Sequence, residues 1–130
     1  MTYELAALAA TTFIHLIAVL WSQRSLEQDI GREGNVGTRE NLEERLSENS
    51  LRLRRALGNH IENTGLFIIA VVLVSFTESN SWVTALAAWI FVAARALYLP
   101  AYRFAWVPWR SLLFTAGFLA CFVMIVASLF

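Results

Sequence analysis

Residues 55–76 read RALGNHIENTGLFIIAVVLVSF, and this stretch decides the fold. Its purely apolar part, Leu66 to Phe76, is too short to cross a bilayer, because a hydrocarbon core of about 30 Å needs roughly 20 helical residues. A spanning helix here must therefore begin upstream, among Arg55, Asn59 and Glu62. We predict that these polar side chains lie inside the membrane.

Three other stretches are apolar over a similar length, and 58% of the chain is hydrophobic, against roughly 45 to 50% in soluble domains. We predict a single all-α domain over residues 1–130, an integral membrane four-helix bundle. The first helix should be retained rather than cleaved as a signal peptide, because Glu4 stands where a basic segment is needed. The helices are expected at about residues 3–21, 41–76, 82–103 and 108–129.

The connection between the first two helices is strongly polar. Its glycine-rich part, residues 22–38, is predicted to be a solvated loop. Asn41 and Glu44 resemble a capping box at the start of the second helix, and Glu48 with Arg52 forms a favourable i,i+4 pair. The second helix is therefore expected to begin in water and run into the membrane.

The ten arginines gather toward one side of the predicted bilayer, and ten acids balance them. Because there is no basic surplus, no nucleic-acid partner is expected. Seven arginines lie between the first helix and the body of the second, and three lie around the last connection, whereas the 77–81 turn has none. By the positive-inside rule the arginine-rich connections are cytoplasmic and both termini lie outside. We expect a bacterial inner membrane, with periplasmic termini, because the short chain carries no targeting signal.

The polar residues of the second helix share one face. Arg55, Asn59 and Glu62 are spaced i, i+4, i+7, and Glu62 falls roughly 10 Å below the cytoplasmic interface. A carboxylate at that depth needs a partner, because burying a lone charge in a membrane costs several kcal/mol.

The third helix carries a matching face. Arg95, Tyr98 and Tyr102 are spaced i, i+3, i+7, and Arg95 falls at about the depth of Glu62. We therefore expect the two faces to meet, with Glu62 paired to Arg95 in the bundle interior.

The fourth helix adds two polar residues at its start. Arg110 and Ser111 follow Pro108, where unpaired backbone N–H groups and the helix dipole favour an anion. Together the three helices describe a cytoplasm-facing pocket for an anionic or zwitterionic ligand. Each residue also has a simpler explanation, because end-of-helix arginines snorkel to the interface and tyrosines join aromatic belts.

No metal site is predicted. Cys121 is the one cysteine and is expected to be a small buried hydrophobe. His60 lies about 200° around the helix from Glu62, so the two side chains cannot hold one metal ion. For His60 and His15 an inter-helix hydrogen bond is expected.

The run Arg55-Ala56-Leu57-Gly58-Asn59-His60-Ile61-Glu62-Asn63 resembles the second-helix signature of the MAPEG family, the membrane-associated proteins in eicosanoid and glutathione metabolism. Chain length, four spans, the charged first connection and the later tyrosine and arginine series are similar to that family too. The resemblance implies a homotrimer of four-helix bundles, surrounded by membrane lipids, with glutathione bound between subunits and open to the cytoplasm.

The resemblance also implies roles for individual residues. Arg24 would bind a glutathione carboxylate, Arg110 would stabilise the glutathione thiolate, and Ser111 would assist. The remaining predicted glutathione contacts come from the second and third helices and are Arg55, Asn59, Glu62, Arg95, Tyr98 and Tyr102.

Three positions depart from the family pattern. Phe114 stands where several enzymes carry tyrosine, Gly58 where some synthases have a second arginine, and His60 where many members have aspartate. We predict a glutathione-dependent enzyme of the transferase or peroxidase type, acting on hydrophobic electrophiles or lipid peroxides. The alternative is a non-catalytic scaffold or accessory subunit with the same fold.

Overall fold

The computed structural model describes residues 1–130 as a chain of helices without strands. Four of its helices are long and apolar enough to cross a membrane, which confirms the all-α, four-span prediction. The elements in chain order are α1 (Tyr3–Val36), α2 (Leu42–Arg45), α3 (Glu48–Phe76), α4 (Trp82–Arg103) and α5 (Trp109–Ala127).

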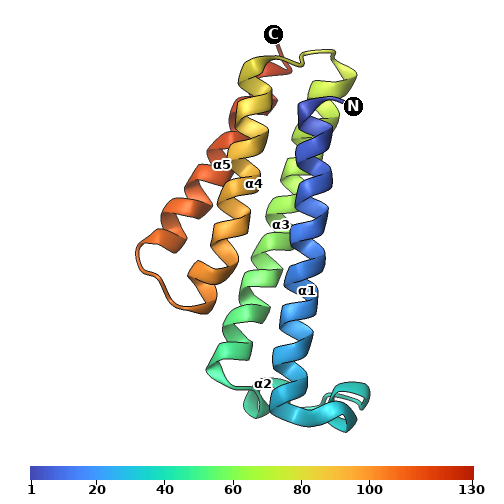
Figure 1. The fold of residues 1–130 in the computed structure, drawn as a ribbon, viewed down its shortest axis with the longest axis vertical. Coiled ribbons are helices and arrows are strands. Elements are labelled where there is room, and N and C mark those ends of the chain that lie inside the picture. Colours follow the sequence, from blue (N-terminus) through green and yellow to red (C-terminus); the bar gives the residue numbers. More distant parts are fainter.

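The four long helices run side by side, with α1 next to α3 and α4 next to α5 (Figure 1). The core is aromatic at its centre, where the buried rings of Phe67 and Phe91 stack with centroids 4.0 Å apart. Small buried residues such as Ala70 and Ala88 surround this pair. Small residues let membrane helices approach closely, which favours association where lipid supplies no hydrophobic drive.

Residues 22–38 are not the predicted solvated loop. Helix α1 continues through most of this segment to Val36, because Ser22 and Leu26 are buried, which ties the extension to the rest of the fold. The interruption comes only at Gly31, whose φ of 70° lies in the region that glycine adopts without a Cβ clash. The prediction gave the three glycines too much weight and the helix-compatible residues before them too little.

The predicted single helix over residues 41–76 is divided. Asn41 adopts the left-handed conformation and makes no capping hydrogen bond, so the predicted capping box is wrong. Helix α3 begins instead after Ser47, whose side chain accepts from the Ser50 N–H at 3.3 Å. The Ser47 hydroxyl and N–H also donate to Asp29 Oδ2, at 2.8 and 2.9 Å, which ties this start to the α1 extension.

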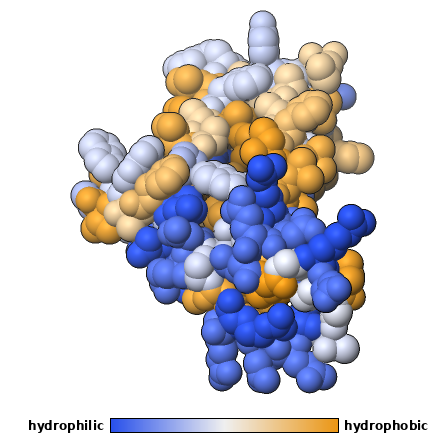
Figure 2. All heavy atoms as spheres, turned by 60° about the horizontal axis from the view of Figure 1, so that its bottom comes forward, coloured by the Kyte–Doolittle hydropathy of each residue, from blue (hydrophilic) through white to orange (hydrophobic).

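The two ends of the bundle differ in charge. Both termini and the α3–α4 turn lie together at one end, which we name the termini end, and α2 lies at the other, the arginine-rich end (Figure 1). Helices α1 and α3 extend past the α4–α5 connection at the arginine-rich end, and hydrophilic side chains cover this projection (Figure 2). A step therefore separates the projection from the α4–α5 connection.

Candidate functional site

A cleft of about 390 Å³ lies among α3, α4 and α5 near this step. Such a volume falls in the range of roughly 300 to 1,000 Å³ that is usual for small-molecule sites. Eight residues line it, of which six were predicted site residues. The lining residues are Arg55, Asn59, Tyr98, Tyr102, Arg110, Ser111, Phe114 and Thr115.

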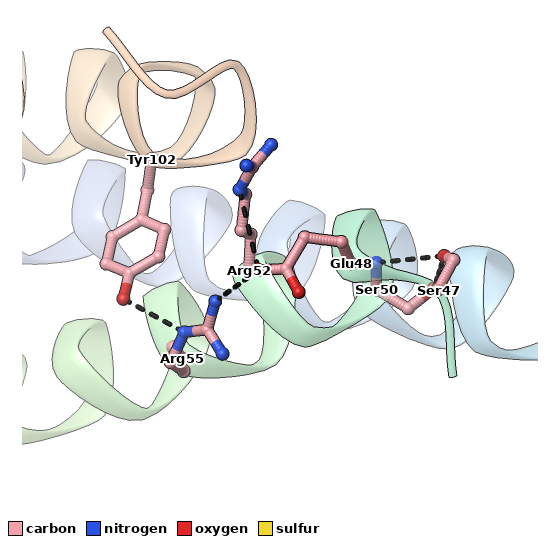
Figure 3. Close-up of polar contacts among 6 residues, drawn as sticks. All are labelled: Ser47, Glu48, Ser50, Arg52, Arg55 and Tyr102. Atoms are coloured by element: carbon pink, nitrogen blue, oxygen red, sulfur yellow. Dashed lines mark hydrogen bonds and ion pairs between the residues drawn. The ribbon is translucent and has the colours of Figure 1, made fainter. Parts of the chain in front are cut away.

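Arg55 joins two helices at the edge of the cleft. Its Nε donates to the Tyr102 hydroxyl at 3.2 Å, and its Nη2 lies 2.9 Å from Glu48 Oε1 (Figure 3). The same Glu48 oxygen lies 3.8 Å from Arg52 Nε, which confirms the predicted i,i+4 pair. Glu48 therefore holds Arg55 toward α4 while its own charge is shared between two arginines.

Arg95 is the largest fully buried side chain of the protein, with 1% of its surface exposed. Its Nε donates to His60 Nδ1 at 3.3 Å and its Nη2 to Asn59 Oδ1 at 3.2 Å. Its guanidinium also lies 4.2 Å from the centre of the Tyr98 ring. All three partners are neutral, so the buried positive charge has no carboxylate beside it.

The two tyrosines of α4 connect the buried and exposed arginines. The rings of Tyr98 and Tyr102 lie 5.8 Å apart, and the Arg110 guanidinium lies 4.9 Å from the centre of the Tyr102 ring. A cation over an aromatic face gains roughly 0.5 to 2 kcal/mol. Tyr102 thus contacts Arg55 through its hydroxyl and Arg110 through its ring, which places two guanidinium groups beside one cleft.

The start of α5 differs from the prediction. The N–H of Arg110 bonds to the Trp106 carbonyl at 3.1 Å, and the N–H of Ser111 bonds to the Pro108 carbonyl at 3.1 Å. These donors are satisfied within the chain because the α4–α5 connection folds back on the helix start. The side chains of Arg110 and Ser111, which line the cleft, are therefore the groups available to an anion.

Glu62 does not pair with Arg95, and this prediction is wrong. Glu62 is exposed and forms no ion pair within the chain. Arg95 donates to both Asn59 and His60, so it faces the side of α3 that lies between these two positions. At about 100° per residue, the Glu62 side chain leaves the helix about 110° around from that side. The two faces meet as expected, but through neutral groups.

Arg24 also lies outside the cleft. It is exposed on the α1 extension, where it borders a separate shallow hollow with Glu27 and Gln28. One chain therefore brings neither Arg24 nor Glu62 to the cleft.

The histidines lie behind Arg95. The predicted inter-helix hydrogen bond is confirmed for His60, which is fully buried and accepts from Arg95. His15 of α1 instead stacks on the His60 ring with centroids 5.5 Å apart, and its Nδ1 has no partner. No group of His, Cys, Asp or Glu side chains is arranged to hold a metal.

Thr115 was not predicted as a site residue, although a signal for it was available. It follows Ser111 by one helical turn, at i+4, and its hydroxyl donates to the Ser111 carbonyl at 2.9 Å. Phe114, which follows Arg110 at i+4, lines the cleft with a ring that carries no hydroxyl. Extending the helix face of Arg110 and Ser111 by one turn would have placed Phe114 and Thr115 at the site.

The family model described as the MAPEG family matches residues 1–130, the whole chain. The chain belongs to the MAPEG family. Neither a curated protein nor a solved structure matches it. Membership of MAPEG makes it a membrane protein of the glutathione and eicosanoid metabolism family, in agreement with its four apolar helices.

The cleft matches part of the chemistry of glutathione, with which MAPEG members are generally associated. Glutathione carries two carboxylates, one ammonium group and one thiol. Arg55, Arg110 and the tyrosine hydroxyls fit the carboxylates and a thiolate, since charge-assisted bonds from arginine are strong. The ammonium group lacks an acid, because no carboxylate lines the cleft of a single chain.

Proposed function

We propose that the chain is a glutathione-dependent membrane enzyme of the transferase or peroxidase type, acting on hydrophobic electrophiles or lipid peroxides. One observation carries the proposal. Arg110 and Arg55, whose charge is shared with Glu48, border a cleft that no acid lines, and the unpaired charge of Arg95 lies behind it. A cationic site of this kind is stabilised by an anion.

The arginines and tyrosines around the cleft have proposed tasks. Arg55 and Tyr102 bind a carboxylate of glutathione, and Arg95 orients Asn59 and Tyr98 from behind. When bound, glutathione would supply a thiol nucleophile that displaces the leaving group of an electrophile, or, for a peroxide, one of two thiols that become a disulfide as the peroxide is reduced to an alcohol and water. Arg110 holds the sulfur as thiolate, because a nearby cation lowers a thiol pKa from about 8.5.

A homotrimer would complete the site. Glu62 is exposed on the membrane-spanning part of α3, where a lone carboxylate is costly unless another protein group covers it. We propose that neighbouring subunits bring Glu62 to the glutathione ammonium group and Arg24 to its second carboxylate. This arrangement supplies the acid that the single-chain cleft lacks.

The proposed location follows from the charge distribution. All ten arginines lie on α1 after Trp21, in the connections or on the halves of α3, α4 and α5 nearer the arginine-rich end. By the positive-inside rule that end faces the cytoplasm and the termini face the periplasm of a bacterial inner membrane. The cleft then lies near the cytoplasmic interface, where a hydrophobic substrate enters laterally from the bilayer.

A second candidate is a non-catalytic scaffold or accessory subunit of the same fold. It is favoured by Phe114, which lines the cleft without a phenol donor, and by Gly58, which adds no second cation. In this case the cleft would hold a lipid or remain without a reactive ligand.

The deciding experiment is thermal unfolding of the detergent-purified protein with and without millimolar glutathione. A ligand that binds only the folded state raises the unfolding midpoint by mass action. We expect glutathione to raise the unfolding midpoint of the wild type and to raise it less in Arg110→Ala and Glu62→Ala. Arg103→Ala is the control and should keep the full increase, because Arg103 ends α4 and does not line the cleft. No shift in the wild type would refute glutathione binding. Turnover of an aryl halide or a lipid hydroperoxide then separates the enzyme from the scaffold.

A further inference from the structure

A second hollow lies at the termini end, far along the bundle from the cleft. It is a groove of about 600 Å³ between the start of α1 and the start of α4. We name it the Glu4 groove. Its walls are largely apolar and aromatic and include Tyr3, Trp82, Leu86 and Trp89.

Glu4 is the one charged side chain among the residues that line this groove. It is 2% exposed, and its two oxygens accept hydrogen bonds from the Thr84 hydroxyl and from Asn80 Nδ2, the latter at 2.9 Å. Both donors are neutral. Hydrogen bonds therefore stabilise this carboxylate, but no cation is paired with it.

The chain offers no side-chain cation to Glu4. It contains no lysine, and its arginines lie away from the termini end. The two ion pairs of the structure both involve Glu48, so the amino terminus at Met1 forms none with Glu4. No cation of the structure therefore lies in contact with Glu4.

The walls of the groove fit such a cation at headgroup depth. Trp82 is 78% exposed and Tyr3 is 73% exposed, and exposed aromatic rings at helix ends mark the membrane interface. Aromatic faces also attract ammonium groups. Leu86 and Trp89 continue along α4 toward the bilayer centre and are exposed, which leaves an apolar track beside the groove.

We propose that the Glu4 groove binds the headgroup of an aminophospholipid from the leaflet at the termini end. The primary ammonium group donates to Glu4 between Tyr3 and Trp82, and an acyl chain lies along Leu86 and Trp89. A soluble amine would make no use of the apolar track. A quaternary ammonium headgroup has no N–H to donate and is too bulky for a carboxylate that is nearly covered.

The test compares two lipids that differ only in the headgroup amine. Short-chain phosphatidylethanolamine and phosphatidylcholine of equal acyl length are titrated into the detergent-purified full chain, and the unfolding midpoint is followed. We expect the wild type to bind phosphatidylethanolamine roughly fivefold more tightly, about 1 kcal/mol. Glu4→Gln should bind the two lipids equally. Glu78→Gln is the matched control, because Glu78 is the other acid of this end, is exposed and does not line the groove.

A second variant, Trp82→Leu, tests the groove without changing the buried Glu4 side chain. Trp82 is too exposed to support the core, so this variant should keep the lipid-free midpoint and lose affinity for phosphatidylethanolamine. Equal binding of both lipids by the wild type, or a preference that persists in Glu4→Gln, would overturn the proposal. Binding of neither lipid would overturn it as well and would indicate that a second copy of the chain covers the groove.

Discussion

The Arg95 Nη2 on α4 donates to the Asn59 Oδ1 on α3 across 3.2 Å, so a buried cation and a residue of the cleft wall share one bond. The same Asn59 oxygen accepts from Asn63 Nδ2 at 3.3 Å, while Arg95 also reaches His60. The interior of the bundle therefore fixes the orientation of the Asn59 amide. This connection between core and cleft gives the first prediction.

Asn59→Leu should destabilise the protein by about 1 to 2 kcal/mol, because inter-helix hydrogen bonds in membranes reach such values and the buried Arg95 loses an acceptor. The free energy of unfolding in mixed detergent and denaturant measures the effect. Arg52→Gln serves as control, since the Arg52 ion pair at 3.8 Å is loose and partly exposed, and it should change stability by less than about 0.5 kcal/mol. Equal effects of the two substitutions would contradict the proposed role of Asn59.

Under the proposed function, Tyr102→Phe should weaken glutathione binding by about 1 kcal/mol, or roughly fivefold, because Arg55 loses the hydroxyl that orients it. The Phe ring still lies against Arg110, so Tyr102→Leu, which removes both contacts, should weaken binding further. Calorimetric titration with glutathione provides the affinities. Tyr3→Phe at the termini end is the matched control and should leave the affinity unchanged. If Tyr102→Phe and Tyr102→Leu lose the same affinity for glutathione, the contact between the Tyr102 ring and Arg110 has no role in binding.

The sequence predicted the membrane fold well because bilayer thickness is a length constraint. Because Leu66–Phe76 is too short to cross the bilayer, the polar half of the helix had to belong to the span. The structure agrees, since α3 runs unbroken from Glu48 to Phe76. The sequence did not predict the α1 extension, because its glycines are a local signal that favours a loop. The burial of Leu26 depends on contacts with the rest of the fold, which the local sequence does not show.

Six of the predicted site residues line one cleft, whereas Glu62 does not pair with Arg95 and Arg24 lies outside the cleft. Spacing placed Arg55, Asn59 and Tyr102 on faces that meet, because helix periodicity fixes such faces. Charge complementarity suggested Glu62 as the partner of Arg95, but the rotation of α3 about its axis presents His60 instead. That rotation is set by packing of the whole bundle, which spacing along one helix does not determine.

Gly31→Ala should loosen the α1 extension, because an L side chain at φ 70° costs roughly 1 to 3 kcal/mol. The loss is local, so hydrogen exchange of amides in residues 22–36 is expected to accelerate severalfold while the core of α1 stays protected. Gly58→Ala is the contrasting variant. Gly58 is helical with open space around it, so alanine should slow exchange in α3 by favouring the helix, by about 0.5 to 1 kcal/mol. Unchanged exchange in Gly31→Ala would mean that the kink is not required by the fold.

Thr84→Val should destabilise the termini end, because the Thr84 hydroxyl is one of two donors to the buried Glu4 carboxylate. Valine keeps the shape of threonine but leaves one carboxylate oxygen without its donor, at a cost of about 1 to 3 kcal/mol. Thr12→Val is the control, since the Thr12 hydroxyl bonds only to the Leu8 carbonyl on an exposed face of α1, and it should be nearly neutral. Thermal unfolding at neutral pH compares the two. In Glu4→Gln the Thr84→Val substitution should cost less than in the wild type, because a neutral amide tolerates the lost donor better than a carboxylate does. An equal cost in both backgrounds would show that Thr84 stabilises α4 through its own cap at Ser81 rather than through Glu4.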